Sequence, residues 1–184
     1  MNLKEKFNLN TFQKYFIYFM MYAVIGWLYE VFLEVVVYRW GFTNRGVLFG
    51  PYCPVYGVGA LLFIFLINPL IKKKNIQMKL LFIPIVFILS GLAATVLELV
   101  TSYLCEWTMG SWPWQTYVDY TYNFQGRIAL SPSIRFGLGG VLFLYILQPL
   151  FVKLTEKVSN RVINKVSIVL GIIVFVDVIC TVLL

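Results

Sequence analysis

Five long apolar segments run through this chain, and they restrict it to folds whose helices sit in a lipid bilayer. Each segment is about 20 residues long or longer, which is the length of helix that crosses a hydrocarbon core of about 30 Å. Only 12% of the 184 residues are charged, whereas soluble domains carry about 25%. We therefore predict an all-α membrane protein with a single transmembrane domain, residues 1–184. Its five predicted transmembrane helices run roughly from Tyr15 to Tyr38, Tyr52 to Ile71, Lys79 to Cys105, Ile134 to Leu154 and Val162 to Leu184.

The distribution of lysine and arginine predicts the orientation of these helices, because loops on the cytoplasmic side carry an excess of both residues. With a cytoplasmic N-terminus, eleven of these residues lie inside and four lie outside. We predict an N-in, C-out topology. Membrane orientation also accounts for the net charge of +7, so we expect no nucleic-acid partner.

An internal repeat is visible in the second and fourth apolar segments. Residues 57–70 align with residues 137–150 without a gap, and six of the fourteen positions are identical. The sequence thus favours two parallel helix-pair repeats, about 15–71 and about 79–154, with an extra helix at about 162–184. The alternative is a chance likeness between glycine-rich apolar helices that both end in a polar residue, proline and leucine.

The sequence lacks the residues of several common kinds of site. It has no histidine, which removes a Ser-His-Asp triad, a Cys-His pair and any His-ligated metal. It has no GxxxxGK[ST] motif, which removes nucleotide hydrolysis by a P-loop. We expect no cofactor and no metal, and an enzyme is the less favoured class.

Glutamates inside the apolar segments are the main candidates for a functional site. Glu30 and Glu98 lie late in outward-going helices, where a carboxylate costs about 2.5–3.5 kcal/mol on insertion scales. Arg45 and Arg127 come from the outer segments that follow. We predict an outward-facing pocket with the two glutamates as its floor and the two arginines as its roof. The alternative is that Arg45–Glu30 and Arg127–Glu98 are ion pairs that only hold the helices together.

Other polar residues of the outer half receive lesser roles. Glu34 shares a helix face with Glu30, but we expect Glu34 and Glu106 to be solvated near the interface. Asp177 either closes the pocket or faces a partner subunit. Free thiols are favoured over a disulfide between Cys53 and Cys105.

Several motifs resemble one bacterial family. They are Gly26-Trp27-Leu-Tyr-Glu30, the stretch from Asn44-Arg45-Gly46 to Pro54-Val-Tyr56-Gly57, Leu97-Glu98, Asp119-Tyr120 and Asn123-Phe-Gln-Gly-Arg127. Over about residues 17–150 the chain resembles the family named putative ABC-transporter type IV permeases, or CmpB-like proteins. The resemblance implies transport. The binding residues that we predict from both arguments are Glu30, Arg45, Tyr52, Tyr56, Glu98, Asp119, Asn123 and Arg127.

Three functions remain open at this point. The first is a permease or substrate-binding membrane subunit that works with a separate ATPase or another membrane subunit. The second is a membrane-embedded enzyme that acts on a lipid or a phosphorylated substrate at the outer leaflet. The third is a non-catalytic assembly or sensor protein. We rank them in this order, and we expect a multi-pass protein of a bacterial cytoplasmic membrane, in contact with membrane lipids, as a homo-oligomer or a hetero-complex.

Overall fold

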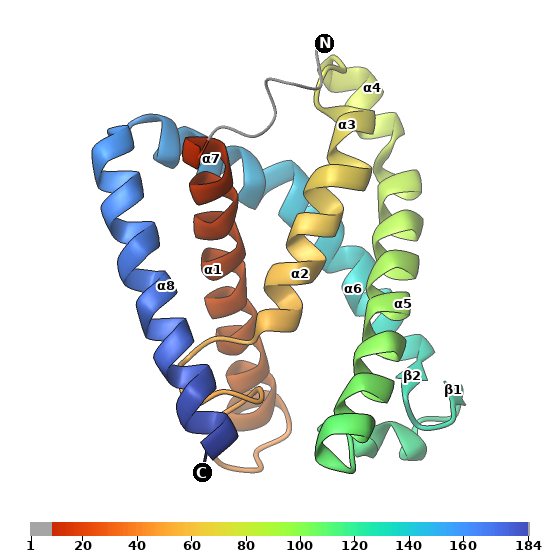
Figure 1. Cartoon of the computed structure of the whole chain (residues 1–184). Helices are drawn as coiled ribbons and strands as arrows, with labels where there is room; N and C mark the ends of the chain where they lie inside the picture. The colour runs from red at the N-terminus through yellow and green to blue at the C-terminus, as the bar shows by residue number, and fades with distance from the viewer. Residues whose placement is uncertain (1–8, 184) are drawn as a thin grey trace. The chain divides into compact units, whose positions relative to one another are not determined.

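The computed structural model describes residues 9–183, and it contains five helices that are long and apolar enough to cross a membrane (Figure 1). The predicted helical fold with five helices of membrane-spanning length is therefore confirmed, and a short two-stranded hairpin is added to it. These membrane-length helices extend over Asn10–Val37, Pro54–Ile71, Ile83–Met109, Leu130–Glu156 and Asn160–Leu183.

The chain divides into two compact units that we treat separately. Unit 1 comprises Met1–Leu61 and Leu150–Leu184, and unit 2 comprises Leu62–Pro149. The boundary falls inside two of the membrane-length helices, so neither unit coincides with one of the predicted repeats.

Unit 1 is built around its first and last helices. Helices α1 and α8 lie side by side and run in the same direction (Figure 1). Met20 and Ala23 of α1 form a buried core with Tyr52, against which Leu170 and Val174 of α8 pack. Its elements are α1 (Leu9–Phe32), the π-helical turn η2 (Leu33–Val37), α2 (Pro54–Leu62), most of α7 (Gln148–Glu156) and α8 (Asn160–Leu183).

Unit 2 is a pair of packed helices, α5 and α6, joined by irregular residues 110–129, which we call the outer segment after the predicted topology. This segment contains a short 3-10 helix and a two-stranded antiparallel hairpin in which Asn123 pairs with Ala129 and Phe124 with Ile128. Its elements are η3 (Phe63–Ile67), α3 (Asn68–Ile71), α4 (Ile76–Leu81), α5 (Ile83–Met109), η4 (Gln115–Asp119), β1 (Asn123–Phe124), β2 (Ile128–Ala129), α6 (Leu130–Leu142) and η5 (Phe143–Leu147).

Two helix starts differ from the sequence prediction because of proline. The third membrane helix does not begin at Lys79: a separate helix, α4, ends at Leu81, and α5 begins at Ile83 with Pro84 in its first turn. The fourth begins at Leu130, earlier than predicted, with Pro132 in its first turn. Proline is well tolerated there, because the first amides of a helix have no partner within the helix.

Each unit contains one copy of the same close contact between two helices. A Cβ atom added to Gly57 of α2 would lie 2.8 Å from the carbonyl oxygen of Phe19 on α1. A Cβ atom added to Gly137 of α6 would lie 2.9 Å from the carbonyl oxygen of Phe87 on α5. In both units glycine is required because the neighbouring backbone fills the space of a side chain.

This contact predicts a large difference between two neighbouring glycines of α6. Gly137→Ala should destabilise the protein by about 1–3 kcal/mol, the usual cost of overpacking, because the main chain of Phe87 cannot move aside cheaply. Gly139→Ala is the matched control, since nothing lies within 4 Å of a Cβ atom there. Melting temperatures of the two purified variants in detergent measure the effect, and equal values would contradict the packing.

Candidate functional site

Glu30 of α1 receives a hydrogen bond from a tyrosine of α2. The hydroxyl of Tyr56 donates to the Glu30 carboxylate. The two helices can approach each other here because Gly26 has no side chain, and the Tyr56 ring fills the space that a Cβ atom would take. Glu30 is half-buried. Two of the predicted binding residues of unit 1 are therefore in direct contact.

Arg45 pairs with Glu34 and not with Glu30. Its guanidinium lies 2.8 Å from a carboxylate oxygen of Glu34, and the hydroxyl of Thr43 donates to the same carboxylate at 2.6 Å. Glu34 is only 4% exposed, so the expected solvated role for this residue is wrong. The irregular segment after α1 folds back over Glu34 and supplies these partners.

Asp177 of α8 anchors the segment that precedes α2. Its carboxylate accepts the backbone amides of Phe49 and Gly50 at 2.9 and 2.8 Å, and it accepts the hydroxyl of Tyr52. Hydrogen bonds to a charged group contribute about 1.5–3 kcal/mol each. Asp177 is therefore a structural anchor of unit 1, and it fixes Tyr52, another predicted binding residue.

Cys53 follows this anchored segment and is an inert thiol. It is buried, and its amide donates to the carbonyl of Ala23 on α1 at 2.9 Å. Burial raises the pKa of the Cys53 thiol to about 12, and the negative charge of Glu30 adds to the shift. All three cysteines of the chain are free, as the sequence favoured.

In unit 2 a carboxylate of a membrane-length helix also accepts a hydrogen bond from a tyrosine. Glu98 of α5 is 8% exposed, and the hydroxyl of Tyr117 from the outer segment donates to it at 2.9 Å. Ser102 and Glu106 follow at spacings of four residues, which places all three on one face of α5. Glu98 and Ser102 are buried beneath the outer segment, while Glu106 stays partly exposed.

Arg127 is enclosed by aromatic rings and a carboxylate. Its guanidinium carbon lies 4.1 Å from the ring centres of both Tyr103 and Trp112, a cation–π arrangement. It pairs with Glu106 and not with Glu98, although 44% of the Glu106 side chain stays exposed. Arg127 itself is 7% exposed, so its first role is to hold the outer segment on α5.

Asp119 and Asn123 lie outside this cluster. Asp119 is exposed at the end of η4 and makes no hydrogen bond or ion pair within the described residues 9–183. Asn123 holds the hairpin together: its amide group donates to the carbonyl of Tyr120 at 2.8 Å and accepts the amide of Gly126 at 2.9 Å. Both polar atoms of the Asn123 side chain are therefore already hydrogen-bonded to the backbone.

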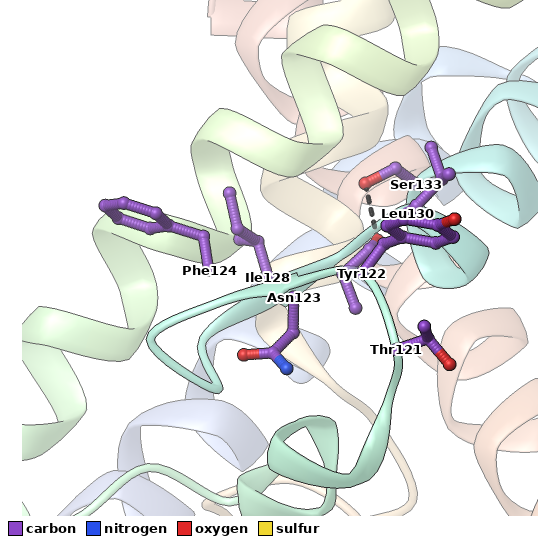
Figure 2. Close-up of a pocket in the computed structure, with 8 residues that line it drawn as sticks. Thr121, Tyr122, Asn123, Phe124, Ile128, Leu130 and Ser133 are labelled. Carbon is purple, nitrogen blue, oxygen red and sulfur yellow. Dashed lines mark hydrogen bonds between the residues drawn. The ribbon is translucent and has the colours of Figure 1, made fainter.

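A surface cavity of about 380 Å³ lies beside this hairpin (Figure 2). Asn123 is the one predicted binding residue among those that line it. In its wall the hydroxyl of Ser133 donates to the carbonyl of Ala129 at 2.9 Å, drawn as a dashed line in Figure 2. The lining residues are Thr121, Tyr122, Asn123, Phe124, Ile128, Ala129, Leu130 and Ser133.

The structure thus pairs most of the predicted residues, although with partners that the sequence did not identify. Glu34, Glu106, Tyr117 and Asp177 were missed as partners. The spacing of Glu30 and Glu34 was a usable signal, because it placed a second acid on the face that receives Arg45. No sequence pattern indicated Tyr117 as a partner of Glu98, because Tyr117 lies in an irregular segment without helix periodicity. The predicted pocket draws on residues of both units, and it stays a prediction.

Comparison with known proteins identifies the family. The model of the family described as "Putative ABC-transporter type IV" matches residues 17–182. The chain belongs to this family. The match continues through α8, beyond the region of residues 17–150 in which the motifs showed the resemblance. No curated protein and no solved structure matches the chain. Family and fold together fit a multi-pass membrane transport protein.

Loss of the Asp177 anchor should make Cys53 accessible. In a C105S/C180S background, Asp177→Asn should raise the rate at which N-ethylmaleimide modifies Cys53 several-fold, because the neutral side chain holds the amides of Phe49 and Gly50 less tightly. Thr181→Val is the matched control, since it removes only a 3.5 Å contact to the same carboxylate. Mass spectrometry of the modified protein gives both rates, and equal rates for the two variants would contradict the anchor.

Proposed function

We propose that the chain is the membrane-embedded permease or substrate-binding subunit of a transporter, with its binding groups in the outer half of the membrane. The family supports transport. The site is supported by one observation above all: each unit holds a carboxylate inside a membrane-length helix and donates a tyrosine hydroxyl to it. Such buried carboxylates are costly and mark ion or substrate pathways.

We further propose that the chain is built of two parallel helix-pair repeats in an N-in, C-out topology. The close contact of Gly57 with Phe19 and that of Gly137 with Phe87 support the repeat. The π-helical turns support it too, because Phe63–Ile67 and Phe143–Leu147 occupy positions that the sequence alignment pairs. The excess of lysine and arginine on one side supports the orientation.

The repeat makes Glu30 and Glu98 corresponding residues. The shift of 68 residues that relates Phe19 to Phe87 also relates Glu30 to Glu98. Under this proposal the two carboxylates occupy corresponding positions in the sequences of the two repeats. We propose them as the direct binding groups, one in each repeat.

The remaining binding residues then act around these carboxylates. In this proposal Tyr56 orients Glu30, while Arg45 and Arg127 set the local charge and position the outer segments through Glu34 and Glu106. Tyr52, Asp119 and Asn123 belong to the same outer segments and complete the set.

A transporter built on this chain requires further subunits. Five helices are few for a translocation path, and the connections Lys72–Asn75 and Lys157–Ser159 that face the proposed cytoplasmic side are short. We propose that a separate ATPase or another membrane subunit joins it, in a homo-oligomer or a hetero-complex of the bacterial cytoplasmic membrane.

The partner prediction is tested by gentle purification of the tagged chain from its native membrane. Mass spectrometry should find a nucleotide-binding subunit in the purified complex. A complex without any ATPase, but with a bound phosphorylated lipid that it converts, would replace the permease by an enzyme of the outer leaflet.

The site prediction is tested by removing charge at the two carboxylates. Glu30→Gln and Glu98→Gln should each reduce the small-molecule or lipid ligand that native mass spectrometry detects on the purified complex by at least tenfold, because a neutral amide lacks the charge and the second acceptor oxygen of the carboxylate. Each variant should keep its melting temperature within a few degrees. Glu156→Gln is the control, since this exposed acid lies outside both clusters. Full ligand occupancy in both test variants would remove Glu30 and Glu98 from the site.

A further inference from the structure

In unit 1 the beginning of α1 lies near the turn that joins α7 to α8 (Figure 1). Residues of these three helices and of the turn line an apolar groove there. The groove has a volume of about 220 Å³. Ile17 of α1, Leu154 of α7 and Val162 and Val166 of α8 line it. None of the residues described above as a candidate binding group lies in it.

The groove offers little to a polar ligand. Its one polar lining residue, Thr155, is buried, and its hydroxyl is already hydrogen-bonded to the hydroxyl of Tyr18 at 2.7 Å and to the carbonyl of Phe151 at 2.9 Å. The rest of the lining is aliphatic. An occupant of this groove is therefore a hydrocarbon chain or an apolar side chain.

The rim of the groove carries a marked excess of positive charge. Residues 150–166 contain four cations and a single acid, Glu156. Each of the four cations directly precedes a residue that lines the groove, namely Leu154, Val158, Val162 or Val166. None of them forms an ion pair within the described residues 9–183. The four are Lys153, Lys157, Arg161 and Lys165, and Lys14 of α1 adds a fifth.

We propose that this groove binds an anionic phospholipid of the bilayer, with one acyl chain against Val162 and Val166 and the phosphate at the rim formed by Lys157 and Arg161. An acyl chain beside unpaired cations is the combination that such a lipid complements, since basic pockets between helices attract anionic head groups. The long side chains of lysine and arginine reach the head group while their stems stay on apolar surface. A zwitterionic lipid with the same chains matches the groove but not the rim.

The test compares two lipids on the intact protein. Native mass spectrometry of the detergent-purified chain is carried out with phosphatidylglycerol and with phosphatidylcholine of identical acyl chains. Phosphatidylglycerol should bind at least fivefold more, and added salt should reduce the difference because it screens the rim charges. Equal binding of the two lipids would overturn the proposal, and so would a dimer without bound lipid, because a second copy would then fill the groove.

Variants separate this groove from general surface charge. K157Q/R161Q should abolish the preference for phosphatidylglycerol. K72Q/K73Q removes two exposed cations from a connection in unit 2 that contributes no residue to the lining of this groove, and it should leave the preference unchanged. Equal losses in the two variants would overturn the proposal, because they would indicate an unspecific electrostatic effect.

The apolar part is tested by filling the groove. Val162→Trp should reduce the binding of phosphatidylglycerol at least fivefold while the charges stay in place. Val158→Trp, from the same lining, is the second variant if Val162→Trp lowers the melting temperature. Undiminished binding in a folded variant would overturn the acyl-chain assignment.

Discussion

The structure depends on carboxylates that sit inside membrane helices and must find partners there. A charged group in hydrocarbon is stable only if other groups of the protein replace its water. In this chain the partners come mostly from the irregular outer segments, which fold back onto the helices. Thr43 and Arg45 meet Glu34, and Tyr117 meets Glu98. The same interactions therefore stabilise the buried charge and also fix the non-helical segment beside it.

Asp177 is a second example of a helix carboxylate that fixes a non-helical segment. The segment before α2 has no helix of its own, so its amides need acceptors. A single carboxylate on α8 satisfies the amides of Phe49 and Gly50 and also holds Tyr52. The last helix is thus an integral part of unit 1 and not an appendage, in agreement with a family match that extends to residue 182.

Arg45 and Arg127 pair with acids other than the ones that the sequence predicted. Both are paired with an acid one or two turns further along the helix than the predicted partner, and Arg127 is also stacked between two aromatic rings. Glu30 and Glu98 each accept the hydroxyl of a tyrosine. Both lie inside membrane-length helices, where a carboxylate is costly and marks an ion or substrate pathway. We therefore place the binding role on the glutamates and a positioning role on the arginines.

The amino-acid sequence was sufficient to predict the five membrane-length helices and the family. These features follow from local composition: a run of about 20 apolar residues spans a bilayer whatever surrounds it, and the motifs around Asn44-Arg45-Gly46 are contiguous in the chain. The exact helix starts depended on how Pro84 and Pro132 are accommodated within the first turns.

Which acid pairs with which arginine became clear from the three-dimensional path of the chain. Glu30 and Glu34 share a helix face, so helix periodicity cannot distinguish them as partners of Arg45. The choice is made by the π-helical turn at Leu33–Val37 and by the path of the segment that follows it. The partners of Tyr117 and Asp177 could not be predicted from the sequence either. Tyr117 contacts a residue 19 positions away, and Asp177 contacts residues more than 120 positions away, so helix periodicity does not relate them.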